Sequence, residues 1–283
     1  MSITLEKIVD DVGELVSLPE VCIRVNELVD DPDSSTNEIG QVISQDPALT
    51  LRILKIANSP FYGASSQIET VSKAVAILGM KQIRDLVLAT SATSVFAGLP
   101  NELVSMKDFW RHSIFCAICA RILSEEYKKG KGEALFISGL LHDIGQLAIF
   151  NKAPEQARQA IILSMEGSDE SDLYGHEVKI MGFDHTQVGG ELVRKWKLPE
   201  SIYECVRFHH EPLKAEKYPV ETAMIHIANS IAVMAELDTI QESAAPAMEP
   251  VAWEIAGLSK DVIEPVMLGA RDQIAEVEAL LSS

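Results

Sequence analysis

Apolar residues recur along this chain at the three- and four-residue spacing of amphipathic helices, and alternating strand patterns are nearly absent. One apolar stripe, with Leu49, Ile53 and Ile56, follows Asp46-Pro47, a pair typical of a helix start because it combines an N-cap residue with a proline at the first helical position. Capping-box spacing predicts another helix start at Ser35-Thr-Asn-Glu38. The pattern predicts an all-α fold.

The same pattern predicts two helical lobes followed by further helices. We expect residues 1–100 to form an amino-terminal helical lobe, 101–212 to form a second helical bundle, and 213–283 to form carboxy-terminal helices that pack on the second lobe. The glycine- and proline-containing segment 96–101 is the best candidate linker between the first two. The segment Ser59-Pro-Phe-Tyr-Gly63 is predicted to break a helix.

One segment is unusual, because it is apolar on nearly every face yet contains a charged residue. From Ala134 to Asn151 there is no lysine or arginine, so we predict a buried helix with His142 and Asp143 side by side inside it. A buried carboxylate without a partner costs several kcal/mol or more. Asp143 must therefore find a cation, a hydrogen-bond network or a metal ion elsewhere in the chain.

Histidines are the candidate partners. Five of the seven fall at the starts, ends or polar points of separate predicted helices between residues 106 and 212, whereas His176 and His226 are interpreted as ordinary structural residues. Imidazole with carboxylate suits iron, manganese, nickel or zinc. A second interpretation stays open, in which Asp143 hydrogen-bonds its neighbour or the backbone and no metal binds. The five candidates are His112, His142, His185, His209 and His210. His185 lies in Asp184-His-Thr-Gln187, whose capping-box spacing predicts a helix start.

Charge and composition narrow the range of partners. The 283 residues include 42 acidic and 24 basic side chains, a net charge of -18 that argues against nucleic acid or an anionic membrane as partner. The start of the sequence lacks the pattern of a signal peptide, so a cytoplasmic location is expected. The four cysteines suggest no disulfide framework, and Cys116-Ala-Ile-Cys119 is predicted to lie in a helix as buried thiols.

The motif His142-Asp-Ile-Gly145, with one histidine upstream and three downstream, resembles the HD superfamily of metal-dependent phosphohydrolases. Shorter motifs on both sides narrow this resemblance, over roughly residues 12–212, to the HDOD family, the HD-related output domain of bacterial signalling proteins. These motifs are Leu18-Pro, Ser44-Gln-Asp-Pro47, Leu54-Lys-Ile-Ala-Asn-Ser59, the Ala74 to Gly79 turn, Leu198-Pro and His209-His-Glu-Pro212.

The resemblance implies an all-helical, non-catalytic or degenerate relative of the phosphohydrolases that acts in regulation, often beside cyclic-dinucleotide signalling domains. It also implies a metal site for one or two divalent transition ions. In that site His112 corresponds to the leading ligand, and His142 and Asp143 to the central pair. His185, His209 and His210 correspond to the additional ligands of the HD-GYP branch.

The chain departs from catalytic relatives at three points. Asn229 stands where the resemblance places a late aspartate ligand, and Gln146 stands where a lysine often follows the central motif. The GYP stretch expected after Pro212 is absent. The neutral amide is a weaker ligand, and the missing lysine removes a cation that would hold a phosphate.

Three functional hypotheses follow. The favoured one is a non-catalytic signal-transduction module that retains a structural or sensory metal and acts on a protein partner. Because no receiver, cyclase or DNA-binding segment is recognised, it is expected to act in trans. The alternative is a metal-dependent phosphohydrolase for nucleotides or cyclic dinucleotides, with Asp143 bridging two ions. The third is a metal-free scaffold.

Overall fold

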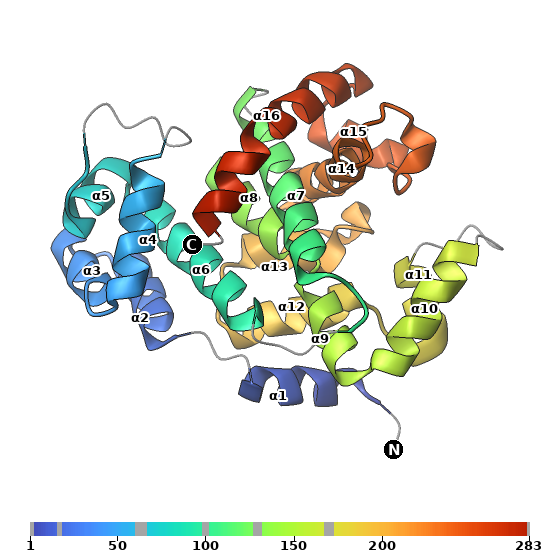
Figure 1. Cartoon of the computed structure of the whole chain (residues 1–283), viewed down its shortest axis with the longest axis horizontal. Helices are drawn as coiled ribbons and strands as arrows, with labels where there is room; N and C mark the ends of the chain where they lie inside the picture. Colours follow the sequence, from blue (N-terminus) through green and yellow to red (C-terminus); the bar gives the residue numbers. More distant parts are fainter. Residues whose placement is uncertain are drawn as a thin grey trace. The chain divides into compact units, whose positions relative to one another are not determined.

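The computed structural model describes residues 3–15, 19–59, 67–97, 102–126, 132–166 and 173–281. Every regular element in these ranges is a helix, which confirms the all-α prediction (Figure 1). The predicted helix break falls largely on residues 60–63 and the predicted linker on 98–101, both outside the described residues.

Close contacts group the helices into two units. Unit 1 comprises residues 1–17 and 98–271, unit 2 comprises 18–97 and 272–283, and the predicted domain boundaries at residues 100 and 212 stay predictions. Unit 2 contains α2 (Glu20–Asp30), α3 (Thr36–Ile43), α4 (Pro47–Ala57), α5 (Val71–Leu78), α6 (Met80–Ala97) and the last part of α16 (Ile263–Leu281). Unit 1 contains α1 (Leu5–Leu15), α7 (Met106–Glu126), α8 (Gly132–Leu141), α9 (Ile144–Lys152), α10 (Pro154–Glu166), α11 (Leu173–Met181), α12 (His185–Lys195), α13 (Glu200–Phe208), α14 (Pro219–Glu236), α15 (Pro250–Ala256), the start of α16 and the short 3-10 helices Pro212–Lys214, Glu242–Ala244 and Lys260–Val262.

The predicted helix starts are confirmed where capping side chains mark them. The Asp184 side chain accepts hydrogen bonds from the backbone of Thr186 and Gln187, and the Gln187 side chain accepts one from the Asp184 backbone. The box predicted at Ser35 is also complete. The box at the start of α12 makes His185 the first residue of that helix and so fixes where its side chain leaves the backbone.

The prediction of one uninterrupted helix from residue 134 to 151 was wrong. α8 ends at Leu141, His142 and Asp143 form a turn, and α9 begins at Ile144. The Nδ1 atom of His142 lies 2.7 Å from the Gly139 carbonyl oxygen, so the ring forms a hydrogen bond with this backbone carbonyl. A side chain that bonds a nearby carbonyl offers the backbone an alternative to continuing the helix.

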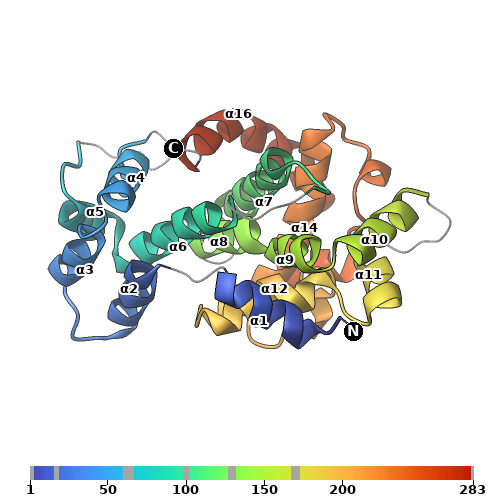
Figure 2. The same cartoon turned by 60° about the horizontal axis from the view of Figure 1, so that its bottom comes forward.

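The expected burial of this segment is confirmed. By length and composition Ala134–Lys152 could cross a membrane, but 83% of its 18-residue window is buried inside the protein. Such burial is typical of the core of a folded domain rather than of a lipid-facing helix. α8 packs against α7, and α9 packs against α1 and α12, as Figure 2 shows.

Glycines allow two of these helix contacts to be unusually close. A Cβ atom at Gly139 of α8 would lie 2.7 Å from the Cα atom of Ala117 in α7. A Cβ atom at Gly145 of α9 would overlap the His185 carbonyl oxygen and lie 2.6 Å from the backbone nitrogen of Gly189 in α12. Because these neighbours are backbone atoms, the helices would have to separate to admit a side chain.

The four cysteines are free and buried, which confirms the prediction of buried thiols at Cys116 and Cys119. Burial raises the pKa of the Cys22 thiol to about 11 and that of Cys205 to about 12. Burial also raises the pKa values of Cys116 and Cys119 well above the ordinary thiol value. Reactive or redox-active cysteines depend on a lowered pKa, so these thiols have the opposite character.

We predict that Gly145→Ala destabilises the protein by about 2 kcal/mol or more, because the added methyl group forces α9 away from α12. Thermal or urea unfolding measures this change. Gly269→Ala in α16 is the matched control, since its Cβ would meet only the side-chain tip of Ile122, at 3.1 Å. Equal stability of the two variants would contradict the close approach.

Candidate metal centre

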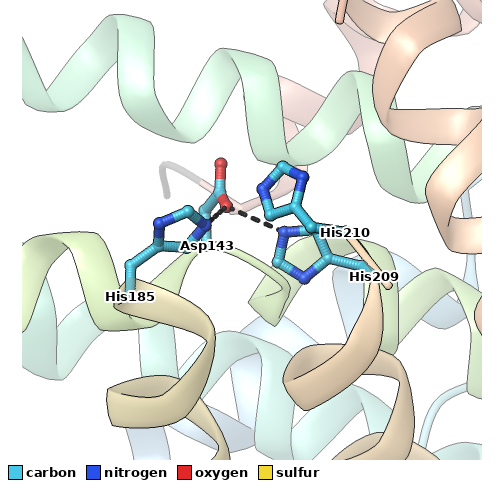
Figure 3. A group of neighbouring side chains, drawn as sticks. All are labelled: Asp143, His185, His209 and His210. Carbon is cyan, nitrogen blue, oxygen red and sulfur yellow. Dashed lines mark ion pairs between the residues drawn. The ribbon is translucent and has the colours of Figure 1, made fainter. Parts of the chain in front are cut away.

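The structure brings together all six residues that the sequence singled out. His112 comes from α7, and His142 and Asp143 come from the turn between α8 and α9. His185 begins α12, and His209 and His210 directly follow α13. All belong to unit 1, and Figure 3 shows Asp143 with three of the histidines, His185, His209 and His210.

Asp143 is almost completely buried, with only 6% of its surface exposed. Its Oδ2 atom lies 3.1 Å from His142 Nε2. Its Oδ1 atom lies 3.3 Å from His185 Nε2 and 3.5 Å from His209 Nε2 (Figure 3). Among the described residues its ion-pair partners are therefore imidazoles, one from the neighbouring His142 and the others from distant parts of the chain, with no lysine or arginine.

The far side of each ring is held by a second group. His142 Nδ1 lies 2.7 Å from the Gly139 carbonyl oxygen, and His209 Nδ1 lies 3.0 Å from that of Val206. His185 Nδ1 lies 2.7 Å from the Glu177 carboxylate. Because Nδ1 donates its hydrogen to these acceptors, Nε2 is left as the position where a proton or a metal ion binds.

The atoms that face the centre are suited to a cation. The Nε2 atoms of His142, His185 and His209 and the Oδ1 atom of Asp143 are buried and make no hydrogen bond with the described residues. An imidazole lone pair and a carboxylate oxygen repel each other unless a proton or a cation lies between them. The donor chemistry and the burial therefore fit a divalent transition ion.

The donor atoms form two groups that share Asp143. We call Asp143, His185, His209 and His210 the first position, and His112, His142 and Asp143 the second position. Within each group one donor atom from every residue lies within 4.8 Å of the others. Donors around one ion at about 2.0–2.2 Å are separated by up to about 4.4 Å, so each group needs only a small adjustment to surround an ion.

Electrostatics favour the protonation states that bind metal at three of these side chains. Burial opposes the charge on Asp143, but the surrounding imidazoles, His142 first, hold the pKa of the carboxyl well below its usual range. Burial lowers the pKa of His209 to about 4 and that of His210 well below its usual value. Asp143 is thus a carboxylate, and both rings are neutral.

His185 differs from its neighbours. Burial opposes its charge, but the Glu177 carboxylate, aided by Asp143, raises the pKa of the ring well above its ordinary value. Without a metal, its Nε2 atom therefore carries a proton. An ion that binds there displaces this proton, as is general for metal binding by histidine.

Sequence analysis missed Glu177. Its side chain is 1% exposed, and its Oε2 atom accepts hydrogen bonds from the His185 ring and from the His185 backbone nitrogen, at 2.7 and 2.8 Å. Only the packing of α11 against α12 places the carboxylate behind His185.

His112 has partners of its own. Its Nδ1 atom lies 3.1 Å from Glu236 Oε2, and its Nε2 atom lies 3.0 Å from Asn229 Oδ1 and 3.9 Å from Asp143 Oδ2. Asn229 therefore does lie beside the centre, where the resemblance placed an aspartate. Glu236 was not singled out from the sequence.

His226 is a structural residue, as interpreted from the sequence. Its Nδ1 atom lies 2.7 Å from the His209 carbonyl oxygen, and its Nε2 atom accepts a hydrogen bond of 2.9 Å from the Glu249 backbone nitrogen. Both ring nitrogens are thus used in holding the backbone that carries His209. His176 is buried in α11 and belongs to neither donor group.

Solved structures with the same fold come from several bacteria. An HDOD domain protein of Geobacter sulfurreducens matches with a TM-score of 0.75 and 22% identity, covering 98% of this chain and 97% of that one. A protein of Shewanella amazonensis SB2B described as a phosphohydrolase matches with a TM-score of 0.72 and 26% identity, covering 99% and 96%. A protein of Marinobacter aquaeolei VT8, described as a signal transduction protein, matches with a TM-score of 0.72 and 21% identity, covering 97% of this chain and 61% of its own length.

Sequence comparison identifies the family. An uncharacterised protein of Treponema pallidum (strain Nichols) is 27% identical over 229 residues, which are 78% of this chain and 43% of the relative, so the chain spans less than half the length of that relative. The sequence model that defines the HDOD domain family matches residues 15–212, which are most of the chain. The resemblance inferred from the sequence is thereby confirmed, and this chain belongs to the HDOD family.

Proposed function

We propose that this chain is a regulatory module that binds a divalent transition metal at the Asp143 centre and acts through a protein partner, without hydrolysing a substrate. The enclosure of the centre carries the proposal. Four of the six donor residues are almost completely buried, since His142 and His209 are 0% exposed, His185 is 1% exposed and Asp143 is 6% exposed, whereas His112 and His210 are partly exposed. In structural metal sites protein side chains fill the coordination positions, as the four donors of the first position would, whereas catalytic sites keep one position open for water or substrate.

The groups that would assist hydrolysis are also weak or missing. A phosphohydrolase stabilises the charge on phosphate oxygens with cations. Gln146 and Asn229 are neutral where catalytic relatives are expected to carry a lysine and an aspartate. The net charge of -18 further disfavours an anionic substrate.

The alternative function is a metal-dependent phosphohydrolase. The carboxylate and imidazole donors around Asp143 favour it, and so does the 26% identical Shewanella protein that is described as a phosphohydrolase. A bound divalent ion would supply Lewis-acid polarisation of a phosphoryl oxygen and would lower the pKa of a water molecule.

The α10–α11 hairpin offers a route from the surface to the centre. α10 and α11 pack on each other and lie at the edge of unit 1 (Figures 1 and 2). α11 carries Glu177, which holds His185, and Tyr174, whose ring stacks on that of His210 with centroids 4.6 Å apart. In α10, Met165 is 82% exposed. We propose that a partner that contacts this hairpin alters the centre through α11, and that metal binding alters the hairpin.

We predict that the protein purified without chelator retains a transition metal, and that Asp143→Asn lowers its metal content by more than about tenfold. The amide removes the one negative donor of the centre. Elemental analysis measures the content. Asp46→Asn is the matched control in unit 2, because asparagine is an equally good N-cap and should leave the metal content unchanged. A metal-free wild-type protein would contradict the proposal.

We predict that the metal-loaded protein hydrolyses bis(p-nitrophenyl) phosphate and cyclic dinucleotides no faster than Asp143→Asn does. Product release measured by chromatography or absorbance provides the comparison. The reason is the enclosure of the donors together with the neutral residues at 146 and 229. Turnover in the wild type that disappears in Asp143→Asn would establish the phosphohydrolase alternative.

We predict that metal binding slows hydrogen exchange in α11 as well as in α12, because the Glu177 carboxylate links the two helices through His185. Mass spectrometry of metal-loaded and chelated protein measures this effect, with α3 of unit 2 as an internal control. Glu177→Ala, which removes both hydrogen bonds to His185, should abolish the change in α11 and weaken metal binding by about 10- to 100-fold. Slower exchange in α12 without any change in α11 would rule out the proposed route.

A further inference from the structure

The two positions around Asp143 differ at His112, because the Nε2 atom of His142 in the second position also makes no hydrogen bond with the described residues. In the first position, the Nε2 atoms of His185 and His209 make no hydrogen bond with the described residues. In the second position, both ring nitrogens of His112 have partners, Glu236 on one side and Asn229 on the other. The His112 Nε2 atom is also 3.9 Å from Asp143, farther than the other three Nε2 atoms.

α14 holds His112 at two points. Asn229 and Glu236 are seven residues apart, which is two helical turns, so they lie on the same face of α14. This helix packs along α7, which carries His112. The Nδ1 atom is 3.1 Å from the carboxylate, and the Nε2 atom is 3.0 Å from the amide oxygen. The ring is therefore fixed in an orientation set by α14 and not by an ion.

The amide is a better partner for this ring than an aspartate would be. A side-chain amide presents either its oxygen or its NH2 group, so Asn229 pairs with Nε2 whether or not that nitrogen carries a hydrogen. A carboxylate accepts hydrogen bonds only. Beside a neutral imidazole whose Nε2 carries a lone pair, a carboxylate would leave that lone pair unpaired, and a cation would satisfy both groups.

The buried charges match one divalent ion. Asp143 is the one carboxylate in either donor group, and the remaining donors are imidazoles. Glu177, which is 1% exposed, supplies a second negative charge behind His185. These two carboxylates balance one dication, whereas a second dication beside His112 would add buried charge that only the partly exposed Glu236 could offset.

We propose that this centre is a one-ion site, and that Asn229 closes the second position by holding His112. The ion lies in the first position, with Asp143, His185, His209 and His210 as its donors. The inference deepens the proposed function and rests on it, since both require a metal at Asp143. It concerns the number of ions and the residue that sets that number.

The test is a count of bound Mn²⁺ per chain after equilibration and desalting, combined with electron paramagnetic resonance. We expect the wild type to hold about one ion, with the spectrum of isolated Mn²⁺, and Asn229→Asp to hold about two, with the spectrum of a coupled pair as in two-metal sites. His112→Ala should leave the wild-type count unchanged, whereas His185→Ala should abolish it.

The outcomes separate this inference from the proposed function. Two ions in the wild type, or loss of the wild-type ion in His112→Ala, would overturn the one-ion site alone. A folded Asn229→Asp that still holds one ion would overturn the role of Asn229. No ion in the wild type would overturn the proposed function together with this inference. If Asn229→Asp does not fold, the comparison of wild type with His112→Ala decides the number of ions.

Discussion

The structure depends on the neutralisation of one buried carboxylate. Asp143 lies in a turn between two apolar helices, with its surface 6% exposed and without lysine or arginine among its described ion-pair partners. A charge in such surroundings costs several kcal/mol unless it is paired. The imidazoles that pair with it come from the neighbouring His142, from α7 and α12 and from the residues after α13, so the interaction that stabilises the buried charge also assembles a set of metal donors. The stability of the fold and the candidate metal site therefore both depend on Asp143.

Close backbone packing and a second layer of hydrogen-bond acceptors hold the donor side chains around Asp143 in position. Gly145, two residues after Asp143, lets α9 approach the His185 backbone closely enough for carboxylate and ring to meet. The Gly139 and Val206 carbonyl oxygens and the Glu177 carboxylate then fix the three rings from behind. The central motif thus combines two kinds of residue. His142 and Asp143 provide the candidate metal donors, and Gly145 allows α9 and α12 to approach closely.

The sequence predicted the all-α fold, several helix starts and the six side chains that the structure brings together, because these features leave local patterns. The capping box at Asp184 placed His185 at a helix start, and the absence of basic residues from segment 134–151 showed that no lysine or arginine of that segment could pair with Asp143. The break after Leu141 could not be predicted, because apolar periodicity does not reveal a ring that bonds a backbone carbonyl. The partner of Glu177 could not be predicted either, because that contact depends on how two helices pack.

Replacing a carboxylate with its amide changes charge and hydrogen bonding while preserving shape. Asparagine at position 229 therefore leaves the packing of α14 on α7 unchanged. His112 then forms a hydrogen bond with Asn229 in place of a bond to an ion. An ion in the first position then ties together the α8–α9 turn, α12 and the end of α13, and through Glu177 also α11. It leaves α7 outside the coordination shell. A change in metal binding is therefore expected to affect the α10–α11 hairpin more than the α7–α14 pair, which is why we propose the hairpin as the responsive surface.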